Sequence, residues 1–331
     1  MSQQPLYPLR FEPIFKSALW GGQRLAEWFG PDVAGGDQVA EAWVLSDQGE
    51  NLSRVAEGPL RGRTLRELLD QTPERILGRS ALTPARRFPL LLKFIDARQV
   101  LSVQVHPHDR HAHLIPEGDQ GKTEAWVILA ADADSAIYAG WRAGAQPEQI
   151  QQAIREHRLG EQLHHFVPKP GDCVFIPAGM VHAIGAGIVL FEIQQTSNVT
   201  FRLHDWDRVD PGTGQTRALH LEEALECLDF TSGPGAPVQP VLEVTEPARR
   251  ELLVACPYFQ LWRWQGKRPF TVGAAGACRV LVGITGQATV EHEGRDYRLR
   301  PGDVLLLPAE VSSCACRPDG PVTLLECGLP E

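Results

Sequence analysis

A short motif occurs twice in this chain of 331 residues, and its recurrence constrains the fold more than any other feature. The copies are PGDCVFIPAG at residues 170–179 and PGDVLLLPAE at residues 301–310. In each copy a PGD turn leads into a short apolar run, which ends at a second turn beginning with Pro-Ala. The repetition predicts that one small β-unit is built twice. A chance match between two common turn sequences is the alternative interpretation.

Length and composition are consistent with two β-rich domains. A chain of 331 residues has room for roughly two domains, each with its own core. Its 31 glycines and 26 prolines favour many short strands joined by tight turns, and so a mainly β fold. The stretch TSGPGAPVQP at residues 231–240 is typical of a linker. We therefore expect a first domain over residues 1–235 and a second over residues 236–331.

Four candidate metal ligands lie on three strand-like segments. They are Gln104 and His106 in LSVQVHPHD, Glu124 in GKTEAWVIL, and His182 in PAGMVHAIG. Because residues two apart on a strand point to the same face, Ser102, Gln104 and His106 can line one wall. Lys122 and Glu124 share a face in the same way. The alternative is that these are unrelated polar residues on half-buried strands, since a single histidine is more often a surface or core group than a ligand.

The chemistry of this set favours Zn²⁺ or a similar divalent cation. Two imidazoles, one carboxylate and one neutral amide suit a borderline metal, and a single anionic ligand leaves the ion with about one positive charge. Such an ion can act as a Lewis acid. A catalytic metal site is therefore the first hypothesis for this chain.

Only the first copy of the repeated motif keeps its histidine. His182 follows the first PGD turn, and Ser313 stands at the same distance after the second. After His220 the chain contains one further histidine, His292. A PGD turn, an apolar strand, a Pro turn and an inward-facing histidine have the form of the second conserved motif of cupins. The pattern predicts a metal-binding cupin (jelly-roll) barrel followed by a cupin-like barrel without metal, and so one Zn²⁺ per chain.

Three segments are predicted to form strands of the first domain. Residues 41–47, EAWVLSD, alternate like a strand that covers one face of a barrel. Residues 88–96 and 100–106 are richer in apolar residues, and we expect them to be adjacent core strands.

Helices are expected to be few and peripheral. The capping-box pair Thr64 and Glu67 precedes a group of leucines and predicts a small helical insert at about residues 64–80. Residues 147–157 and 219–228 carry apolar residues about one turn apart, which predicts two surface helices.

Charge and composition exclude several classes of partner. The net charge is −9 at pH 7, whereas nucleic acids and anionic membranes favour a basic surface. No apolar run approaches the roughly 18–20 residues of a membrane span, and the N-terminus lacks the pattern of a signal peptide. Rossmann and P-loop patterns are absent, so nucleotide chemistry has no support. We expect a cytoplasmic protein, a monomer or weak homodimer, that binds neither nucleic acid nor membrane.

The seven cysteines show no paired framework and are expected to be reduced. Cys314 and Cys316 are interpreted as strand residues rather than metal ligands. Histidines in loop or helix contexts are also interpreted as non-ligands: His108, His111, His113, His157, His164 and His165.

Longer motifs, taken in order, resemble those of one family. The landmarks are FKSALWGGQRL at 15–25, EAWVLSD at 41–47, PLLLKFIDARQVLSVQVHPHD at 89–109, GKTEAWVIL at 121–129, IPAGMVHAIGAGIVLFEIQQTSNVTFRLHDWDR at 176–208, and LHLEEAL. With these motifs, over most of its length, the chain resembles type I mannose-6-phosphate isomerases in their short bacterial form. The resemblance implies a metal-dependent aldose–ketose isomerase that interconverts D-mannose 6-phosphate and D-fructose 6-phosphate through an enediol(ate) intermediate.

The same resemblance implies roles for individual residues. Its zinc ligands would be the four residues already singled out by spacing: Gln104, His106, Glu124 and His182. It gives Arg202 a catalytic role and makes Ser102 and Lys122 contacts for the substrate.

Near the pocket, the chain departs from the common pattern of the family at four positions, one of which is Thr196 in place of a serine. Asn198 stands where an aspartate is usual, and Phe201 and His204 stand where tyrosines are usual. One carboxylate and two phenols are therefore missing, which changes the hydrogen bonding expected around the substrate.

Glu192 is the leading candidate for the base that moves a proton between C1 and C2 of the sugar. It shares a strand face with Gln194 and follows His182 closely enough to return to the pocket. A solvent-facing Glu192, or one paired with Arg202, is the alternative. Lys122 is a rival acid or base if burial lowers its pKa.

Arg202 carries a permanent charge and a fixed fork of donors, which suits an oxyanion or phosphate better than proton exchange. The alternative for Arg202 is a salt bridge to Asp205 or Asp207. Trp20, just before Gly21-Gly22, is expected to cap the mouth of the barrel and to contact the substrate there.

Two other functions remain open from the sequence. One is a cupin that binds a sugar phosphate without catalysis, and the other is a cupin oxidase that uses Fe²⁺. Retention of the full ligand set together with Lys122, Glu192 and Arg202 argues against the first. A three-histidine or facial-triad site would suit the second better than a site with glutamine. We therefore expect a small sugar phosphate as the binding partner.

Overall fold

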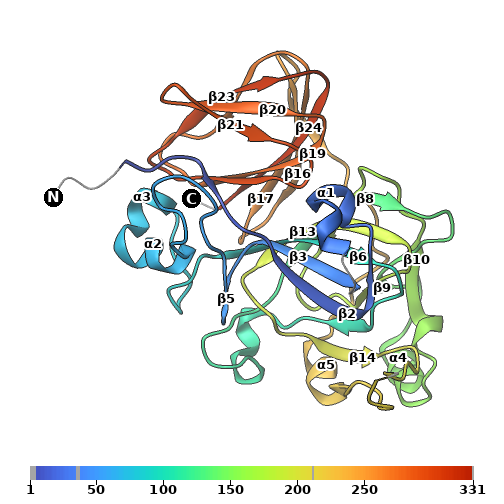
Figure 1. Ribbon diagram of the computed structural model, residues 1–331. Helices are drawn as coiled ribbons and strands as arrows, with labels where there is room; N and C mark the ends of the chain where they lie inside the picture. The colour runs from blue at the N-terminus through green and yellow to red at the C-terminus, as the bar shows by residue number, and fades with distance from the viewer. Residues whose placement is uncertain (1–4, 35–37, 211, 330–331) are drawn as a thin grey trace. The chain divides into compact units, whose positions relative to one another are not determined.

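The computed structural model describes residues 5–34, 38–210 and 212–329 (Figure 1). Strands dominate these residues and the helices are short, so the predicted mainly β fold is confirmed. By its contacts the chain separates into two compact units. The first unit comprises residues 15–42 and 93–238, and the second comprises residues 1–14, 43–92 and 239–331.

Two sheets hold the strands of the first unit. A six-stranded sheet has the order β11-β8-β13-β6-β3-β2. A five-stranded sheet has the order β10-β9-β12-β7-β14. The strands are β2 (Ile14–Gly22), β3 (Val39–Leu45), β6 (Leu90–Ala97), β7 (Val103–Val105), β8 (Glu124–Ala131), β9 (Ile137–Trp141), β10 (Leu163–Phe166), β11 (Cys173–Ile176), β12 (His182–Ile184), β13 (Ile188–Gln195) and β14 (Phe201–His204).

The helices are α1 (Ala26–Phe29), α2 (Leu65–Gln71), α3 (Pro73–Leu77), α4 (Pro147–Arg155) and α5 (Leu221–Cys227), with 3-10 helices η1 (Pro31–Ala34), η2 (Asp109–Leu114) and η3 (Leu159–Gln162). Four of the helices, α2 to α5, lie where sequence signals predicted them, whereas α1 and the 3-10 helices were not predicted. α2 and α3 form the predicted insert. At its start the Thr64 hydroxyl accepts from the Glu67 backbone N–H, and the Glu67 carboxylate accepts from the Thr64 backbone N–H. This pair is the predicted capping box.

Alternation along β7 separates two environments. Val103 and Val105 pack into a core cluster together with residues of α4 and α5, which confirms that these helices cover the outer face of the five-stranded sheet. Ser102 and Gln104 lie on the opposite face of the strand and line a pocket. The predicted inward set of this strand is therefore confirmed.

The prediction that residues 88–96 and 100–106 form adjacent strands is wrong. β6 belongs to the six-stranded sheet, whereas β7 belongs to the five-stranded sheet. The segment between them crosses from one sheet to the other, since the Leu101 N–H already donates to the carbonyl of Ile184 in β12. Every residue of β6 is buried. A strand buried on both faces needs a second layer over it, and the crossing supplies that layer.

The second unit holds a sheet of seven strands, β1-β22-β19-β24-β17-β16-β15, and a sheet of four, β18-β23-β20-β21. Three strands of the smaller sheet, β21, β20 and β23, lie side by side in Figure 1. The strands are β1 (Leu9–Arg10), β15 (Val241–Val244), β16 (Arg249–Ala255), β17 (Gln260–Gly266), β18 (Phe270–Gly273), β19 (Arg279–Thr285), β20 (Ala288–His292), β21 (Arg295–Leu299), β22 (Val304–Leu307), β23 (Ser313–Pro318) and β24 (Val322–Gly328). β4 (Asp47–Gln48) and β5 (Asn51–Leu52) form a separate pair.

The two units repeat one order of strands. When each set is numbered along the chain, β11-β8-β13-β6-β3-β2 and β22-β19-β24-β17-β16-β15 have the same order. The runs β10-β9-β12-β7 and β21-β20-β23-β18 also agree. β11 and β22 are the strands that follow the two PGD turns. The repetition predicted from the motif therefore extends to the order of strands in both sheets.

Strand register assigns equivalent positions in the two units. Ile176 and Leu307 are equivalent within the repeated motif. Ile176 lies opposite Glu124, and Leu307 lies opposite Arg279. The candidate ligand Glu124 therefore corresponds to an arginine.

The remaining candidate ligands also change between the units. His182 lies opposite Gln104, while its counterpart Ser313 lies opposite Gly273. Gln104 thus corresponds to glycine and His182 to serine. The second unit lacks the amide, the carboxylate and this imidazole at the equivalent positions.

The cysteines and helices meet two further expectations. All seven cysteines are free, as predicted. Cys314 and Cys316 lie in β23, again as predicted. Within the described ranges, none of the helices has the length and apolar character needed to cross a membrane.

Candidate active site

Three metal-type donors meet between the two sheets of the first unit. His106 directly follows β7, Glu124 is the first residue of β8, and His182 is the first residue of β12. Their donor atoms all lie within 4.8 Å of one another. Each of the three side chains is only 1% exposed. Strand ends from both sheets therefore converge on one buried point.

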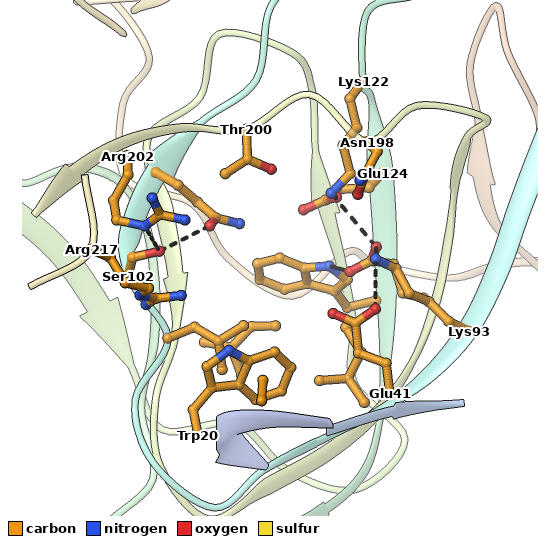
Figure 2. A pocket seen from close by; sticks show the side chains of 17 residues that line it. Trp20, Glu41, Lys93, Ser102, Lys122, Glu124, Asn198, Thr200, Arg202 and Arg217 are labelled. Carbon is orange, nitrogen blue, oxygen red and sulfur yellow. Dashed lines mark hydrogen bonds and ion pairs between the residues drawn. The ribbon is translucent and has the colours of Figure 1, made fainter. Parts of the chain in front are cut away.

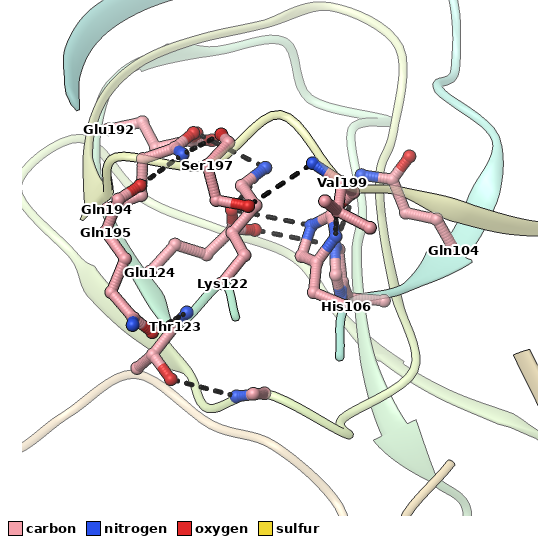
Figure 3. A network of polar contacts seen from close by, with 12 residues as sticks. Gln104, His106, Lys122, Thr123, Glu124, Glu192, Gln194, Gln195, Ser197 and Val199 are labelled. Atoms are coloured by element: carbon pink, nitrogen blue, oxygen red, sulfur yellow. Dashed lines mark hydrogen bonds and ion pairs between the residues drawn. The ribbon is translucent and has the colours of Figure 1, made fainter. Parts of the chain in front are cut away.

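Backbone carbonyls orient both imidazoles of this group. His106 Nδ1 lies 2.8 Å from the Val199 carbonyl oxygen (Figure 3). His182 Nδ1 lies 2.9 Å from the Met180 carbonyl oxygen. A carbonyl can only accept, so each Nδ1 carries the proton and each Nε2 keeps a free lone pair. These Nε2 atoms lie 3.6 and 3.4 Å from the carboxylate of Glu124. Both imidazoles thus present their metal-binding nitrogen to the same place.

A buried atom without a partner supports a metal ion at this point. His106 Nε2 is buried, and no described residue gives it a hydrogen bond. Leaving such an atom unsatisfied is costly, and a divalent cation would satisfy it. The donor set of two imidazoles and a carboxylate fits Zn²⁺ chemistry.

The protonation states suit metal binding. Burial, followed by the charge of Lys122, lowers the pKa of His106 to about 3. Burial also lowers the pKa of His182. Burial alone would raise the pKa of Glu124, but the charge of Lys122 above all holds it well below its ordinary value. Two neutral imidazoles and an ionised carboxylate are the forms that ligate a metal.

Gln104 lies beside the group. Its Nε2 is 3.3 Å from His182 Nε2, and its Oε1 accepts a 3.2 Å hydrogen bond from Ser102 Oγ. An amide binds a metal through oxygen, so ligation by Gln104 requires the amide to be turned over, which exchanges its nitrogen and oxygen. After this turn the Nε2 would donate to Ser102. The structure therefore brings Gln104 to the site, and its role as a ligand stays a prediction.

Buried charges of alternating sign continue from the donor group into the pocket. Lys122 Nζ lies 2.9 Å from Glu124 Oε2 and 3.8 Å from Glu192 Oε1. Lys93 Nζ lies 3.1 Å from the same Glu192 oxygen and 3.6 Å from Glu41 Oε2. Burial would lower the pKa of Lys93, but Glu192 and Glu41 outweigh it and raise that pKa. Lys93 therefore stays a fixed cation beside Glu192.

Glu192 is buried and held on both of its oxygens. It is 2% exposed, and its Oε2 accepts a 2.9 Å hydrogen bond from the indole N–H of Trp126. Burial and the neighbouring Glu124 raise its pKa, while Lys93 and Lys122 oppose that shift. Neither a solvent-facing Glu192 nor one paired with an arginine is observed.

Arg202 lies on the opposite side of the pocket from these lysines. Its Nε donates to Ser102 Oγ at 3.3 Å, and its Nη1 donates to the Ala218 carbonyl at 2.8 Å. Burial and the nearby Arg217 lower the pKa of Arg202. The salt bridge considered for Arg202 does not form among the described residues, because Asp205 pairs with Arg208 and Arg217 instead.

These groups face a cavity of about 410 Å³. Arg202, Arg217 and Ser102 lie together on one side, and Lys93 and Glu41 lie on the other (Figure 2). A volume of this size is in the range of small-ligand sites. The pocket thus offers two guanidinium groups across from a buried chain of carboxylates and lysines.

The structure brings together all nine residues predicted for the site. His106 and His182 lie in the donor group. The other seven line the pocket: Trp20, Ser102, Gln104, Lys122, Glu124, Glu192 and Arg202. Asn198, one of the departures from the family pattern, also lines it.

Sequence patterns do not single out Lys93, Glu41 or Arg217, although all three line the pocket. A signal for Lys93 exists in the run FPLLLKFID, because a lysine inside a fully buried strand must find a charged partner. Arg217 lies in a loop, and no local pattern marks it.

Known proteins are similar to this chain in sequence and in fold. The family model for the catalytic domain of type I phosphomannose isomerase matches residues 9–125. A probable mannose-6-phosphate isomerase of Bacillus subtilis, GmuF, is 35% identical over 309 residues, which is 92% of this chain and 94% of that protein. The chain belongs to the mannose-6-phosphate isomerase family.

Two further members of the mannose-6-phosphate isomerase family extend the comparison. The mannose-6-phosphate isomerase ManA of B. subtilis is 34% identical over 91% of this chain and 93% of its own length. The crystal structure of the mannose 6-phosphate isomerase from B. subtilis matches with a TM-score of 0.87 and 28% identity, over 98% of this chain and 100% of that one. The resemblance predicted from the motifs is confirmed over nearly the whole chain.

Proposed function

We propose that this chain is a metal-dependent aldose–ketose isomerase that interconverts D-mannose 6-phosphate and D-fructose 6-phosphate. One observation carries the proposal: a metal-donor group, a buried carboxylate between two lysines, and a pair of arginines all face one cavity. Relatives that match more than nine-tenths of the chain are named for the same activity.

His106, Glu124 and His182, together with Gln104, would hold one Zn²⁺ per chain. When bound there, zinc would supply a Lewis acid that stabilises negative charge on the sugar oxygens. The choice of zinc rests on the donor set of two imidazoles, one carboxylate and one amide.

The reaction moves one proton between C2 and C1 of the opened sugar. From mannose 6-phosphate, a base removes the C2 proton, the C–H electrons form a C1–C2 double bond, and the former carbonyl oxygen at C1 takes the charge. The O2 hydroxyl proton passes to O1, the abstracted proton returns to C1, and O2 becomes the carbonyl oxygen, which gives fructose 6-phosphate. We assign both proton transfers at carbon to Glu192, whose raised pKa brings it closer to the neutral range in which a base of this kind works best.

The lysines would hold this carboxylate in place. Lys93 and Lys122 lie 3.1 and 3.8 Å from the same oxygen of Glu192, so they favour its ionised form before proton removal. Lys122 also lines the cavity and would contact the substrate oxygens. Lys122 is therefore the second residue that we assign to catalysis.

Arg202, the third residue that we assign to catalysis, would stabilise the negative charge that develops on the sugar oxygens, and Arg217 beside it would bind the phosphate. Their guanidinium groups are permanently charged, and they lie on the same side of the cavity as Ser102. The hydroxyl of Ser102 would add one hydrogen bond. Trp20 would cover an apolar face of the sugar. This arrangement explains how an acidic protein can bind a phosphate locally.

We also propose that the two units are cupin-like barrels, the first catalytic and the second without metal. The expected division of the chain into residues 1–235 and 236–331 stays a prediction; by their contacts, residues 1–14 and 43–92 group with the second unit. The shared order of strands supports the common architecture. The replacement of Glu124 by Arg279 and of His182 by Ser313 supports the loss of the metal in the second. A cytoplasmic location, and a monomeric or weakly dimeric state, stay predictions.

The other two candidate functions have weaker support. A sugar-phosphate-binding protein without catalysis has no need for a buried carboxylate held between two lysines beside a metal-donor group. An Fe²⁺ oxidase is compatible with two histidines and one carboxylate, but the adjacent lysines and arginines match an anionic substrate rather than oxygen.

The test is turnover of fructose 6-phosphate in a coupled assay, with metal content measured on the same preparation. Glu192→Gln is the matched variant, because it keeps the shape of the side chain and removes its basicity. Loss of general-base catalysis should lower kcat by about 10²- to 10⁴-fold with zinc content unchanged. Binding of fructose 6-phosphate without turnover in the wild type would favour the binding protein, and oxygen uptake in the presence of Fe²⁺ would favour the oxidase.

A further inference from the structure

A second group of metal-type donors lies on the surface of the first unit, outside the pocket. The ligand atoms of His157, His204 and Asp207 all lie within 4.8 Å of one another. His157 and Asp207 are exposed, and His204 is half-buried. In the described part of the chain, none of these three side chains has a hydrogen-bond or ion-pair partner. Three metal-type donor atoms therefore lie close together, and among the described residues none of them forms a hydrogen bond or ion pair.

The backbone around this group is held in an uncommon conformation. His157, which follows α4 just beyond Glu156, has a φ of +56°. Trp206 and Asp207 have φ values of +56° and +51°. Left-handed conformations cost residues other than glycine about 1–2 kcal/mol each. Such conformations cluster at functional sites, and here two of the three donors adopt one.

The turn that carries Asp207 is fixed from both sides. The indole N–H of Trp206 donates to the Leu101 carbonyl at 2.7 Å. Arg208 donates to the Val100 carbonyl at 2.7 Å and pairs with Asp205. These contacts hold the turn in place independently of any ligand, so the donors are positioned in advance.

Both other donors belong to elements of the same core. α4, which ends just before His157, contributes Ile154 to the cluster that also contains Leu203 of β14. His204 is the next residue of that strand. The spacing between the two histidines is therefore set by packed side chains rather than by a flexible loop.

We propose that His157, His204 and Asp207 form a second, exchangeable site for a divalent transition-metal ion such as Zn²⁺, with water in the open coordination positions. Two imidazoles and one carboxylate are ligands that such ions prefer. The group also lies at the C-terminal end of α4, where the helix dipole favours a cation. Because its donors are exposed, this site exchanges its ion faster than the buried group around His106.

The proposal reverses the interpretation of His157 as a non-ligand. The loop context of His157 gave no sign of a partner, because His204 and Asp207 lie far along the chain. His204 is also one of the positions at which this chain departs from the family pattern. The site is therefore a property of this chain and is independent of the proposed isomerase activity.

The test uses protein that retains its buried metal, dialysed against graded concentrations of Zn²⁺, with bound zinc per chain measured by atomic emission. One ion should remain in zinc-free buffer, and a second should bind on titration and leave again on dialysis. Loss of even an outer partner of a metal ligand costs about 10- to 100-fold in affinity, so His157→Ala should weaken the second ion at least tenfold. Turnover supported by the first ion should not change.

His164→Ala is the matched control, because it removes another histidine of the same unit and should bind the second ion like the wild type. Asp207→Asn, which keeps the size of the side chain, repeats the test if His157→Ala fails to fold. The proposal is overturned if the wild type binds no second ion at saturating Zn²⁺. It is equally overturned if His157→Ala and Asp207→Asn both bind that ion as tightly as the wild type does.

Discussion

Arg279 occupies the position in the second unit that Glu124 occupies in the first. Its Nε lies 3.6 Å from Glu326 Oε1. Register also makes Glu326 the counterpart of Glu192. The second unit thus has an arginine beside this carboxylate where the first has lysines and a metal-donor group. Each unit thus has its own buried carboxylate at this position, and in the second unit the negative charge of that carboxylate is balanced by an arginine.

Removal of Arg279 should reduce stability and leave the chemistry intact. Arg279→Met leaves Glu326 buried without its guanidinium, and breaking a buried ion pair in this way costs about 3–5 kcal/mol. Denaturant unfolding should show this loss, with zinc content and kcat unchanged. The double variant Arg279→Met/Glu326→Leu should recover part of the stability. Release of zinc by Arg279→Met would contradict a metal site confined to the first unit.

His182→Ala should lose metal and activity together and keep most of the fold. The histidine would supply one donor of the proposed catalytic metal site, and such a site contributes less folding energy than a structural zinc site. Zinc analysis should fall from about one ion per chain to well below one. Ser313→Ala, at the equivalent position of the second unit, is the control and should keep both properties. Near-normal turnover in His182→Ala would exclude this residue as a ligand.

Arg202→Lys should lose most of its turnover, although it keeps the positive charge. An ammonium cannot reproduce the planar fork that contacts Ser102 and faces the cavity. Loss of one preorganised oxyanion donor costs on the order of 10²- to 10³-fold in turnover. Zinc content should not change. A variant with most of its activity and only a lower Tm would show that the guanidinium has a structural role.

Arg217→Ala should weaken binding of the phosphate. Since this arginine shares a wall with Arg202 and is expected to contact a part of the substrate that does not react, KM for fructose 6-phosphate should rise while kcat changes little. Arg142→Ala, which removes an exposed arginine outside the pocket, is the control. An unchanged KM in Arg217→Ala would place the phosphate elsewhere in the cavity.

The buried imidazole of His106 should make the metal-free protein sensitive to acid. Its pKa is about 3 in the folded protein and about 6.5 in an unfolded chain. The unfolded chain binds more protons between these values, so the free energy of unfolding should fall as pH is lowered from about 6.5 toward 3. Unfolding of chelator-treated protein at several pH values measures this slope. The slope should be shallower in His106→Asn, and His165→Asn, which removes an exposed histidine outside the site, is the control.

Local patterns in the sequence predicted the donor group well. Gln104 and His106 share a face through the two-residue period of a strand, and His182 follows a turn that occurs twice. The helical insert was also predictable, because the capping box of Thr64 and Glu67 lies within one turn. Each of these features depends on residues close together in the chain.

Features that depend on distant residues were not predictable in this way. Their apolar runs indicate that β6 and β7 are strands, but they do not show that the two strands belong to different sheets. Lys93 reaches Glu192 from a strand far away in the sequence, and only the fold brings their side chains to 3.1 Å. Arg217 enters the pocket from a loop without periodicity. These contacts are decided by tertiary packing.

Main-chain carbonyls orient both candidate metal-binding histidines, that of Val199 for His106 and that of Met180 for His182. A carbonyl oxygen is present whatever side chain its residue carries, so no replacement at position 199 or 180 can delete the acceptor. The path of the backbone thus fixes the tautomer of each imidazole, and substitutions at residue 199 or 180 leave that acceptor in place. A histidine oriented by another side chain loses its orientation when either residue is mutated. For His106 and His182, only mutation of the histidine itself removes this hydrogen bond.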